Sequence, residues 1–215
     1  MKKMLLIFDL DGTIADTIYS IRDGVNMAMD KHGFPRRDYE QIRQAIGNGA
    51  RELIRLSIPE NRRNDDALID TVLRDYNVFY EATYTNIDGC YPHMSEAIHT
   101  LKDRGYIIAV LSNKQDAYVK KIIALLFPDG TVSYAEGQTE RPRKPDPTGP
   151  LMIAKEFGCS PDECVFIGDS EVDVATAKNA GMKSVGCSWG YRSIDALSDA
   201  DLIINDANEL IRLFE

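Results

Sequence analysis

The chain has 215 residues, a length that fits one large domain or one domain with a smaller insertion. Hydrophobic residues make up 44% of it and charged residues 27%, which is typical of a globular protein with its own core, and no apolar run approaches the ~20 residues of a membrane span. The net charge of −9, from 25 basic and 34 acidic residues, argues against general binding to nucleic acid or to an anionic membrane.

The first predicted element is a strand. Five apolar residues, Met4–Phe8, are typical of a strand buried on both faces of a parallel sheet. Asp9 and Asp11 follow it, and Gly12 permits a sharp turn. Ligands of open α/β sheets bind beyond the carboxyl ends of the strands, so we expect Asp9 and Asp11 at the mouth of a site. A simple turn made by Asp and Gly is an equally good explanation of these residues taken alone.

Residues 15–85 show helical patterns and no strand pattern. The four predicted helices cover 18–32, 35–45, 50–56 and 65–82. The apolar side of the last is predicted to consist of Leu68, Val72, Leu73, Tyr76 and Phe79. This stretch is too long for a plain crossover between two strands. We therefore predict a helical domain of residues 15–85 inserted into a core domain of residues 1–14 and 86–215.

Strands and helices alternate in the rest of the chain. The predicted strands are 106–111, 132–135, 164–167, 183–187 and 201–204. The predicted helices are 95–104, 116–126, 147–157, 173–180 and 208–214. This alternation is typical of an α/β fold with a doubly wound parallel sheet, which is our predicted fold class.

A second pair of carboxylates follows another predicted strand. Asp169 comes just after Gly168, and Asp173 lies one helical turn further on. An acidic first turn, stabilised by ~0.3–1 kcal/mol through the helix dipole, would explain this pair alone. However, two charges ~4 Å apart repel by ~4 kcal/mol at an effective dielectric of 20, so carboxylates from both strands would need a cation. Hard oxygen ligands suit Mg²⁺.

Two further segments carry groups that suit a phosphoryl ligand. Ser112 and Asn113 end the second predicted strand, where a hydroxyl and a backbone N–H can hold two oxygens, or can simply form a turn or helix cap. Lys144 lies in a segment with three prolines in six residues, 142–147, which restricts its position. A restrained lysine can place its charge on a phosphate, whereas a solvated basic run is the alternative.

These motifs together resemble a known family. Asp9-Leu10-Asp11-Gly12-Thr13 is similar to the nucleophile motif of the haloacid dehalogenase (HAD) superfamily, and Ser112 is similar to its second motif. Lys144-Pro145 followed by Pro147 resembles the third motif, and Asp169 with Asp173 the fourth. The resemblance spans nearly the whole chain and is greatest to the phosphoglycolate phosphatase and β-phosphoglucomutase branch, whose Rossmann-like core carries a mobile helical cap.

The resemblance implies a role for each residue. Asp9 would be the nucleophile that forms an aspartyl-phosphate, Asp11 the general acid and base, and Lys144 the cation on the phosphoryl group. Mg²⁺ would be held by Asp9, Asp169 and the main-chain carbonyl of Asp11. Asp173 would bind it directly or contact the groups that bind it. The implied substrate-binding set is Gly12, Thr13, Ser112, Asn113, Lys144 and Arg51. Arg51 would contact a substrate carboxylate or second phosphate, although an exposed helix arginine is at least as good an explanation.

The implied activity is an Mg²⁺-dependent phosphatase of a small phosphorylated metabolite, with phosphoglycolate the nearest candidate. A sugar phosphomutase, a pyrophosphatase, a nucleotidase and a non-catalytic phosphate-binding or regulatory module are the alternatives. Four cysteines without metal-site spacing indicate reduced thiols and a cytoplasmic location. We expect no nucleic-acid or membrane partner and a monomer or homodimer. The loop Trp189-Gly190-Tyr191 also resembles one that follows the family's fifth strand.

Overall fold

The computed structural model describes residues 4–215, which contain a six-stranded parallel sheet with the strand order β3-β2-β1-β4-β5-β6. The predicted doubly wound α/β class is therefore confirmed. Its strands are β1 (Leu5–Phe8), β2 (Ile107–Gln115), β3 (Tyr134–Gln138), β4 (Cys164–Gly168), β5 (Lys183–Cys187) and β6 (Leu202–Ile204). β1 pairs with β2 on one side and with β4 on the other.

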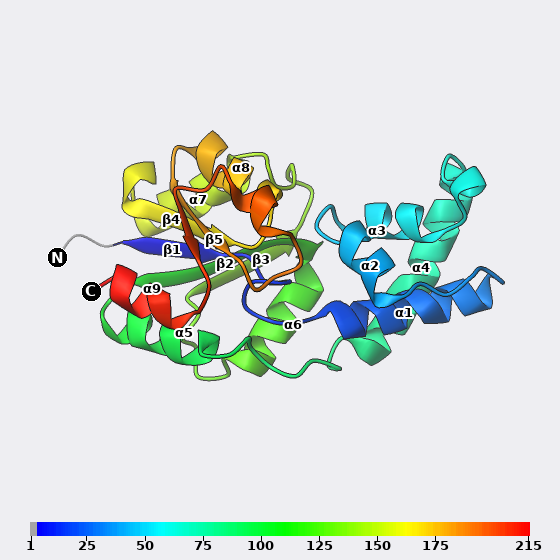
Figure 1. Ribbon diagram of the computed structural model, residues 1–215, viewed down its shortest axis with the longest axis horizontal. Helices are drawn as coiled ribbons and strands as arrows, with labels where there is room; N and C mark the ends of the chain where they lie inside the picture. Colours follow the sequence, from blue (N-terminus) through cyan, green and yellow to red (C-terminus); the bar gives the residue numbers. More distant parts are fainter. Residues whose placement is uncertain (1–3) are drawn as a thin grey trace. The chain divides into compact units, whose positions relative to one another are not determined.

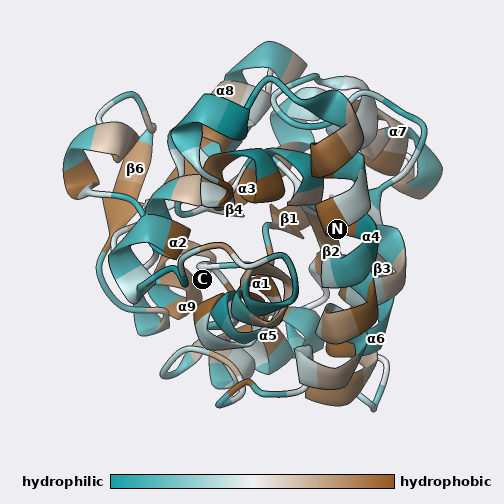
Figure 2. Ribbon diagram, turned by 90° about the vertical axis from the view of Figure 1, so that its right-hand side faces the viewer, coloured by the Kyte–Doolittle hydropathy of each residue, from teal (hydrophilic) through white to brown (hydrophobic). Residues whose placement is uncertain are grey.

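Helices cover both faces of the sheet. α7 (Thr148–Phe157) and α8 (Glu171–Ala180) lie on one face, and α5 (Met94–Asp103), α6 (Asp116–Leu126) and α9 (Asn208–Leu213) on the other (Figure 1). All four residues of β1 are fully buried, as the apolar run predicts. In Figure 2 the strands β1 and β6 are coloured as hydrophobic, whereas helices such as α6 carry both hydrophilic and hydrophobic residues.

Side-chain alternation along β1 divides the core between these two layers. Leu5 and Ile7 belong to one cluster with Phe166 of β4, Ile153 of α7 and Ala177 of α8. Because successive side chains of a strand point to opposite faces, Leu6 and Phe8 lie on the side of α5 and α6. Because β1 is buried on both faces, its position in the sheet is fixed, and so is the position of Asp9, which follows it.

β2 is longer than predicted. The expected strand ended at Leu111, but pairing with β3 resumes at Gln115 opposite Gln138, after a register shift. Ser112 and Asn113 therefore lie within β2 and not beyond its end. The prediction followed the apolar run, whereas the polar continuation is a strand because β3 supplies its hydrogen-bond partners.

The inserted segment contains helices and no strand, with α1 (Ile18–Lys31), α2 (Tyr39–Ala45), α3 (Ala50–Ser57) and α4 (Asp66–Thr83), and a short 3₁₀ turn at Glu60–Arg62. α2 begins four residues later than predicted, because the side chain of Asp38 caps it by accepting from the Gln41 N–H.

The predicted apolar side of α4 is partly wrong. Its buried residues are Ile69, Val72, Tyr76, Tyr80 and Thr83, so Leu68, Leu73 and Phe79 do not belong to the buried side. The helix is turned toward α1, where Thr83 Oγ1 donates to the Ser20 carbonyl over 3.1 Å.

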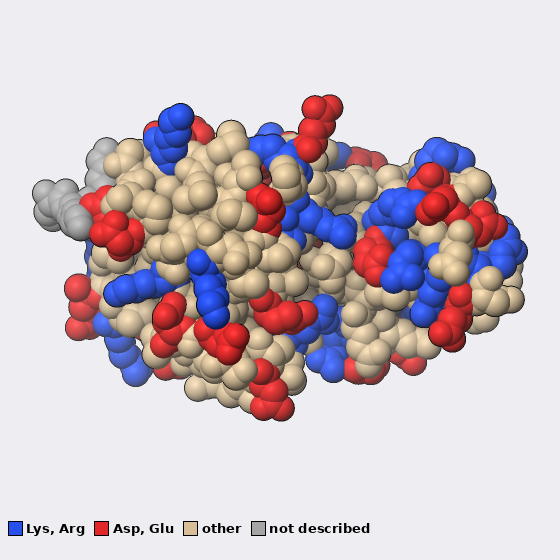
Figure 3. Space-filling view, turned by 90° about the horizontal axis from the view of Figure 1, so that it is seen from above, with Lys and Arg blue, Asp and Glu red and all other residues tan. Residues whose placement is uncertain are grey.

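The chain divides into two compact units. One takes in the chain up to Asp16 together with Gly89–Glu215, and the other is Thr17–Asp88. None of the helices in the described part of the chain is long and apolar enough to cross a membrane. Acidic and basic side chains are interspersed over the face shown in Figure 3, so that face lacks the continuous basic surface typical of nucleic-acid binding.

Candidate active site

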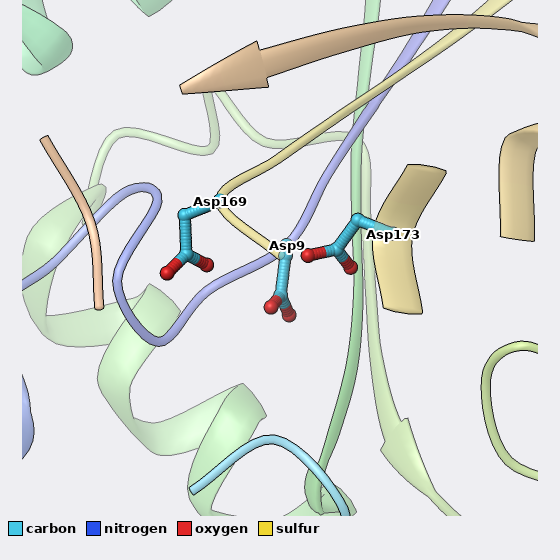
Figure 4. Close-up of side chains that lie close together, drawn as sticks. All are labelled: Asp9, Asp169 and Asp173. Atoms are coloured by element: carbon cyan, nitrogen blue, oxygen red, sulfur yellow. The ribbon is translucent and has the colours of Figure 1, made fainter. Parts of the chain in front are cut away.

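Three of the predicted carboxylates meet at the carboxyl edge of the sheet. Asp9 follows β1 and Asp169 follows β4, and these neighbouring strands are held in register by Asp9 N–H donating to the Ile167 carbonyl over 2.9 Å. Asp173 comes from the first turn of α8. One oxygen from each of the three carboxylates lies within 4.8 Å of the others, and the side chains converge in Figure 4. The strand order reverses between β1 and β4, which is where open α/β sheets bind ligands.

Burial makes this cluster electrostatically costly. The exposed fractions of Asp9, Asp169 and Asp173 are 9%, 3% and 2%. Burial raises the pKa of Asp9 to about 6, with the charges of Asp173 and Asp11 adding to the rise and Lys144 opposing it. The pKa of Asp169 lies well above its ordinary value for the same main reason, burial, reinforced by Asp173 and Asp9. A cation at this point would offset the repulsion.

Lys144 supplies one positive charge. Its Nζ lies 2.9 Å from Asp9 Oδ1 and 2.7 Å from Asp173 Oδ1, and its side chain is 4% exposed. The ammonium also lies 5.3 Å from the centre of the Phe166 ring. Burial lowers the pKa of Lys144, but Asp173 and Asp9 outweigh it and hold the pKa above its ordinary value. Lys144 is therefore a buried site residue and not part of a solvated basic run.

Asn113 holds the Lys144 segment in place. Its side-chain Nδ2 donates to the Lys144 carbonyl over 3.1 Å, and its Oδ1 accepts from the Lys144 N–H over 2.9 Å. Asn179 of α8 donates to the neighbouring Pro145 carbonyl over 2.9 Å. The Asn113 side chain thus positions the lysine, a role that the sequence did not indicate. Ser112 Oγ, at the same end of β2, accepts from the Lys114 N–H over 3.3 Å.

Asp169 is enclosed by residues from two loops. Its Oδ1 accepts from the Thr13 hydroxyl over 3.3 Å and its Oδ2 from the Tyr191 N–H over 2.7 Å. A Cβ at Gly12, where φ is +86°, would lie 2.5 Å from Asp169 Oδ2, and one at Gly190 would lie 2.2 Å from Asp169 Cβ. Both positions need glycine because the carboxylate occupies that space. The sequence does not indicate the positioning roles of Gly190 and Tyr191, although their loop resembles one of the family.

Asp173 is fixed by its own helix. Its Oδ2 accepts from the Ser170 N–H over 3.1 Å and from the Ser170 hydroxyl over 2.5 Å, while the Ser170 hydroxyl accepts from the Asp173 N–H. This is a capping box at the start of α8. A Cβ at Gly168 would lie 2.3 Å from Asp173 Cγ. Asp173 is therefore both the acidic first-turn residue and a member of the cluster.

Asp11 stands apart from the three clustered carboxylates. Its oxygens lie 2.9 and 3.2 Å from Lys114 Nζ, and the two side chains are 12% and 7% exposed. The resemblance implies that Asp11 binds the metal through its main-chain carbonyl, so its side chain is not needed in the cluster. The sequence did not indicate Lys114. The only signal for Lys114 was its position directly after Ser112-Asn113.

Arg51 belongs to the other unit. It lies in the first turn of α3, and its side chain, 47% exposed, pairs with Asp66 over 2.6 Å and with Asp70 over 3.1 Å. The described contacts of Arg51 are thus those of an exposed helix arginine.

The donors of the acidic cluster fit a magnesium ion. Three carboxylates offer hard oxygen ligands within a few ångströms of one another. Asp9 Oδ1 is buried and lies 2.9 Å from Lys144 Nζ. A carboxylate oxygen has more than one lone pair, so this contact leaves it able to bind a metal as well.

Comparison with known proteins identifies the family of this chain. The family model of haloacid dehalogenase-like hydrolases matches residues 6–187. The chain is 29% identical to a phosphoglycolate phosphatase of Haemophilus influenzae (strain 86-028NP) over 97% of each chain, and 31% identical to one of Psychrobacter arcticus over 89% of this chain and 86% of that one. A solved structure described as a predicted phosphoglycolate phosphatase, from Haemophilus somnus 129PT, superposes with a TM-score of 0.91 at 26% identity and covers 100% of this chain and 99% of its own. The chain belongs to the haloacid dehalogenase-like hydrolase family and is one of its phosphatases.

Proposed function

We propose that the chain is an Mg²⁺-dependent phosphatase that acts through an aspartyl-phosphate on Asp9, and that phosphoglycolate is its substrate. The observation that carries the proposal is the contact of Lys144 with Asp9 beside two further buried carboxylates. A carboxylate nucleophile attacks a phosphate dianion only where positive charge offsets the repulsion. The choice of phosphoglycolate rests on the relatives, which carry that activity in their names.

The reaction has two halves. In the first, an Asp9 oxygen attacks phosphorus, the bond to the leaving oxygen breaks, and Asp11 gives that oxygen a proton. In the second, Asp11 takes a proton from water as the water attacks phosphorus, which releases phosphate and restores the Asp9 carboxylate. Lys144, the Ser112 hydroxyl and the backbone N–H of Asn113 hold the phosphoryl oxygens, with Gly12 and Thr13 beside them in the loop after Asp11.

We assign the metal to Asp9, Asp169 and the main-chain carbonyl of Asp11, with Asp173 beside them. When bound, Mg²⁺ supplies the charge that lets a dianionic phosphate approach three carboxylates. Thr13 and Tyr191 hold both oxygens of Asp169 in fixed directions, which limits how far this ligand can turn.

We propose that the helical unit is a cap that sets the substrate and that Arg51 binds the carboxylate of phosphoglycolate. Arg51→Gln is then expected to raise KM for phosphoglycolate by about tenfold, as loss of one charge-assisted hydrogen bond predicts, and to leave KM for ethyl phosphate unchanged. Arg62→Gln, which removes another arginine paired with a helix carboxylate, is the matched control. Equal KM values in the wild type and Arg51→Gln would remove Arg51 from the substrate site.

The four free cysteines suit a reducing compartment, so we propose a cytoplasmic location. A monomer or homodimer remains our prediction, and its test is the mass in solution.

The activity is tested by phosphate release from a panel of substrates with and without Mg²⁺. The panel contains phosphoglycolate, sugar phosphates, nucleoside monophosphates and pyrophosphate, so it also tests the nucleotidase and pyrophosphatase alternatives. Asp9→Asn is expected to be inactive, whereas Asp129→Asn, which changes an exposed aspartate of the same unit, should retain activity. Isomerisation of a sugar phosphate without phosphate release would show a mutase. A folded protein that binds phosphate but turns over nothing would show a binding module.

A further inference from the structure

A second buried lysine, Lys114, serves the other carboxylate of the nucleophile motif. Lys144 contacts Asp9 and Asp173, whereas Lys114 contacts Asp11 through both carboxylate oxygens, at 2.9 and 3.2 Å. The Lys114 side chain is 7% exposed, which is rare for a lysine. Burial of an ammonium is unfavourable unless a partner compensates it, so this contact is specific and not a chance surface pair.

The backbone around Lys114 is built to hold it there. Between the paired positions Leu111–Glu136 and Gln115–Gln138, β2 has three residues, Ser112–Lys114, where β3 has only Gly137. Such bulges redirect side chains and are common beside active sites.

Gly137 permits the bulge. A Cβ at this position would lie 2.3 Å from the Lys114 carbonyl oxygen and 2.6 Å from Asp116 Cα. Its N–H donates to Asp116 Oδ1 over 3.1 Å, which fixes the chain just after Lys114. The bulge, the glycine and this hydrogen bond therefore set the direction from which Lys114 reaches Asp11.

We propose that Lys114 is a positioning residue for Asp11. It holds the carboxyl group at the mouth of the site, so that one oxygen can stay on Lys114 while the other is presented to the leaving oxygen of the substrate. The proposal rests on the proposed function of Asp11 as the acid that protonates the leaving oxygen. Misplacing a reacting group by ~1 Å can lower a rate by about a hundredfold, so a tether of this kind matters for catalysis.

The test compares leaving groups in Lys114→Met. Loss of acid catalysis slows release of an alkoxide, which needs a proton, but hardly affects release of p-nitrophenolate, which leaves without one. Asp11 also serves hydrolysis of the aspartyl-phosphate, which is common to all substrates, so the comparison uses kcat/KM, which reports the first half of the reaction. For Lys114→Met we expect kcat/KM for phosphoglycolate and ethyl phosphate to fall by about ten- to a hundredfold, with kcat/KM for p-nitrophenyl phosphate changing less than about threefold. Lys114→Arg, which keeps a cation, is expected to recover much of the loss.

The matched control is Lys102→Met, which removes a lysine of α5 whose exposed hydrogen bond goes to Ser133 Oγ, and it should leave all three substrates unaffected. An equal loss of kcat/KM on all three substrates in Lys114→Met would show a merely structural role and overturn the proposal. An increase in KM confined to phosphoglycolate would show that Lys114 binds the substrate carboxylate, which would also overturn it.

Two further results separate this proposal from the proposed function. Asp11→Asn must itself show the same leaving-group dependence, and its absence would overturn the role of Asp11 and, with it, that of Lys114. A crystal structure of Lys114→Met tests the positioning without any turnover. We expect the Asp11 carboxylate to leave its wild-type position, and an unchanged carboxylate would refute the positioning role even in an active enzyme.

Discussion

Lys144 Nζ lies 2.9 Å from Asp9 Oδ1, in a pair whose side chains are 4% and 12% exposed. Removing one partner of a buried pair leaves the other charge without compensation, at a cost of about 3–5 kcal/mol. We expect Lys144→Met to lower the free energy of unfolding by about 3 kcal/mol in the absence of Mg²⁺, because Asp9 and Asp173 both lose their counter-charge. Urea unfolding with and without Mg²⁺ measures this, and saturating metal should restore part of the loss.

Lys120→Met provides the comparison, since its ion pair with Asp116 has side chains 60% and 26% exposed and should contribute less than about 1 kcal/mol. If the two variants were equally stable without metal, the Lys144 contacts would not hold the site together. Activity of Lys144→Met should be lost even where Mg²⁺ restores the fold.

The Asn113 side chain should affect activity through Lys144. Its two hydrogen bonds to the Lys144 backbone are lost in Asn113→Ala, which we expect to lower the free energy of unfolding by about 1–3 kcal/mol and kcat by at least about tenfold. Asn179→Ala removes one exposed hydrogen bond to the same segment, at Pro145, and should change kcat much less. Equal kcat values for the two variants would contradict the positioning role of Asn113.

The sequence predicted the convergence of Asp9 and Asp169 because each follows a buried apolar strand, and parallel strands end at the same edge. The pairing of β1 with β4 could not be predicted, because it depends on the order of all six strands. The role of Lys114 could not be predicted for a related reason. The polar end of β2 has no hydrophobic alternation, and only its pairing with β3 makes it a strand.

The buried side of α4 in the helical unit also could not be predicted from the sequence alone. Two overlapping apolar stripes run along α4, one through Phe79 and one through Tyr80, and periodicity alone does not choose between them. Contact with α1 decides: a Cβ at Gly24 would lie 3.3 Å from the rings of Tyr76 and Tyr80, so these residues pack on the glycine.

Gly190 should be intolerant of even one methyl group. Its added Cβ would lie 2.2 Å from Asp169 Cβ and 2.5 Å from the Gly12 carbonyl oxygen, so Gly190→Ala must displace a carboxylate of the acidic cluster. We expect the Kd for Mg²⁺ to rise by about ten- to a hundredfold, as for loss of the groups that orient metal ligands. Calorimetric titration with Mg²⁺ measures it.

Gly130→Ala separates this effect from general strain. Gly130 has a φ of +77° and open space around its Cβ direction, so alanine there should lower the free energy of unfolding by about 1 kcal/mol while the Kd for Mg²⁺ stays unchanged. A Gly190→Ala protein with normal metal affinity would show that Asp169 does not need its enclosure.

Magnesium binding should weaken as the pH falls through about 6. In the metal-free protein the pKa of Asp9 is raised from 3.8 to about 6, chiefly by burial, and that of Asp169 is raised in the same direction. A raised carboxyl pKa means that the proton stabilises the folded state. This stabilisation is fully present below about pH 4 and is lost as the pH rises through about 6.

Mg²⁺ requires ionised ligands, so it competes with those protons and replaces the stabilisation they provide. Each carboxyl group that must lose a proton lowers the apparent affinity by about tenfold per pH unit below its pKa. We therefore expect the increase in Tm on adding saturating Mg²⁺ to be larger at about pH 7.5 than at about pH 5, and the Kd from calorimetry to rise by tenfold or more over the same interval. The Asp129 carboxyl has its pKa lowered to about 2, chiefly by the Thr131 hydroxyl, so it does not titrate between the two pH values. Asp129→Asn should therefore give the wild-type pH profile. A Kd that is equal at the two pH values would mean that neither Asp9 nor Asp169 gives up a proton when the metal binds.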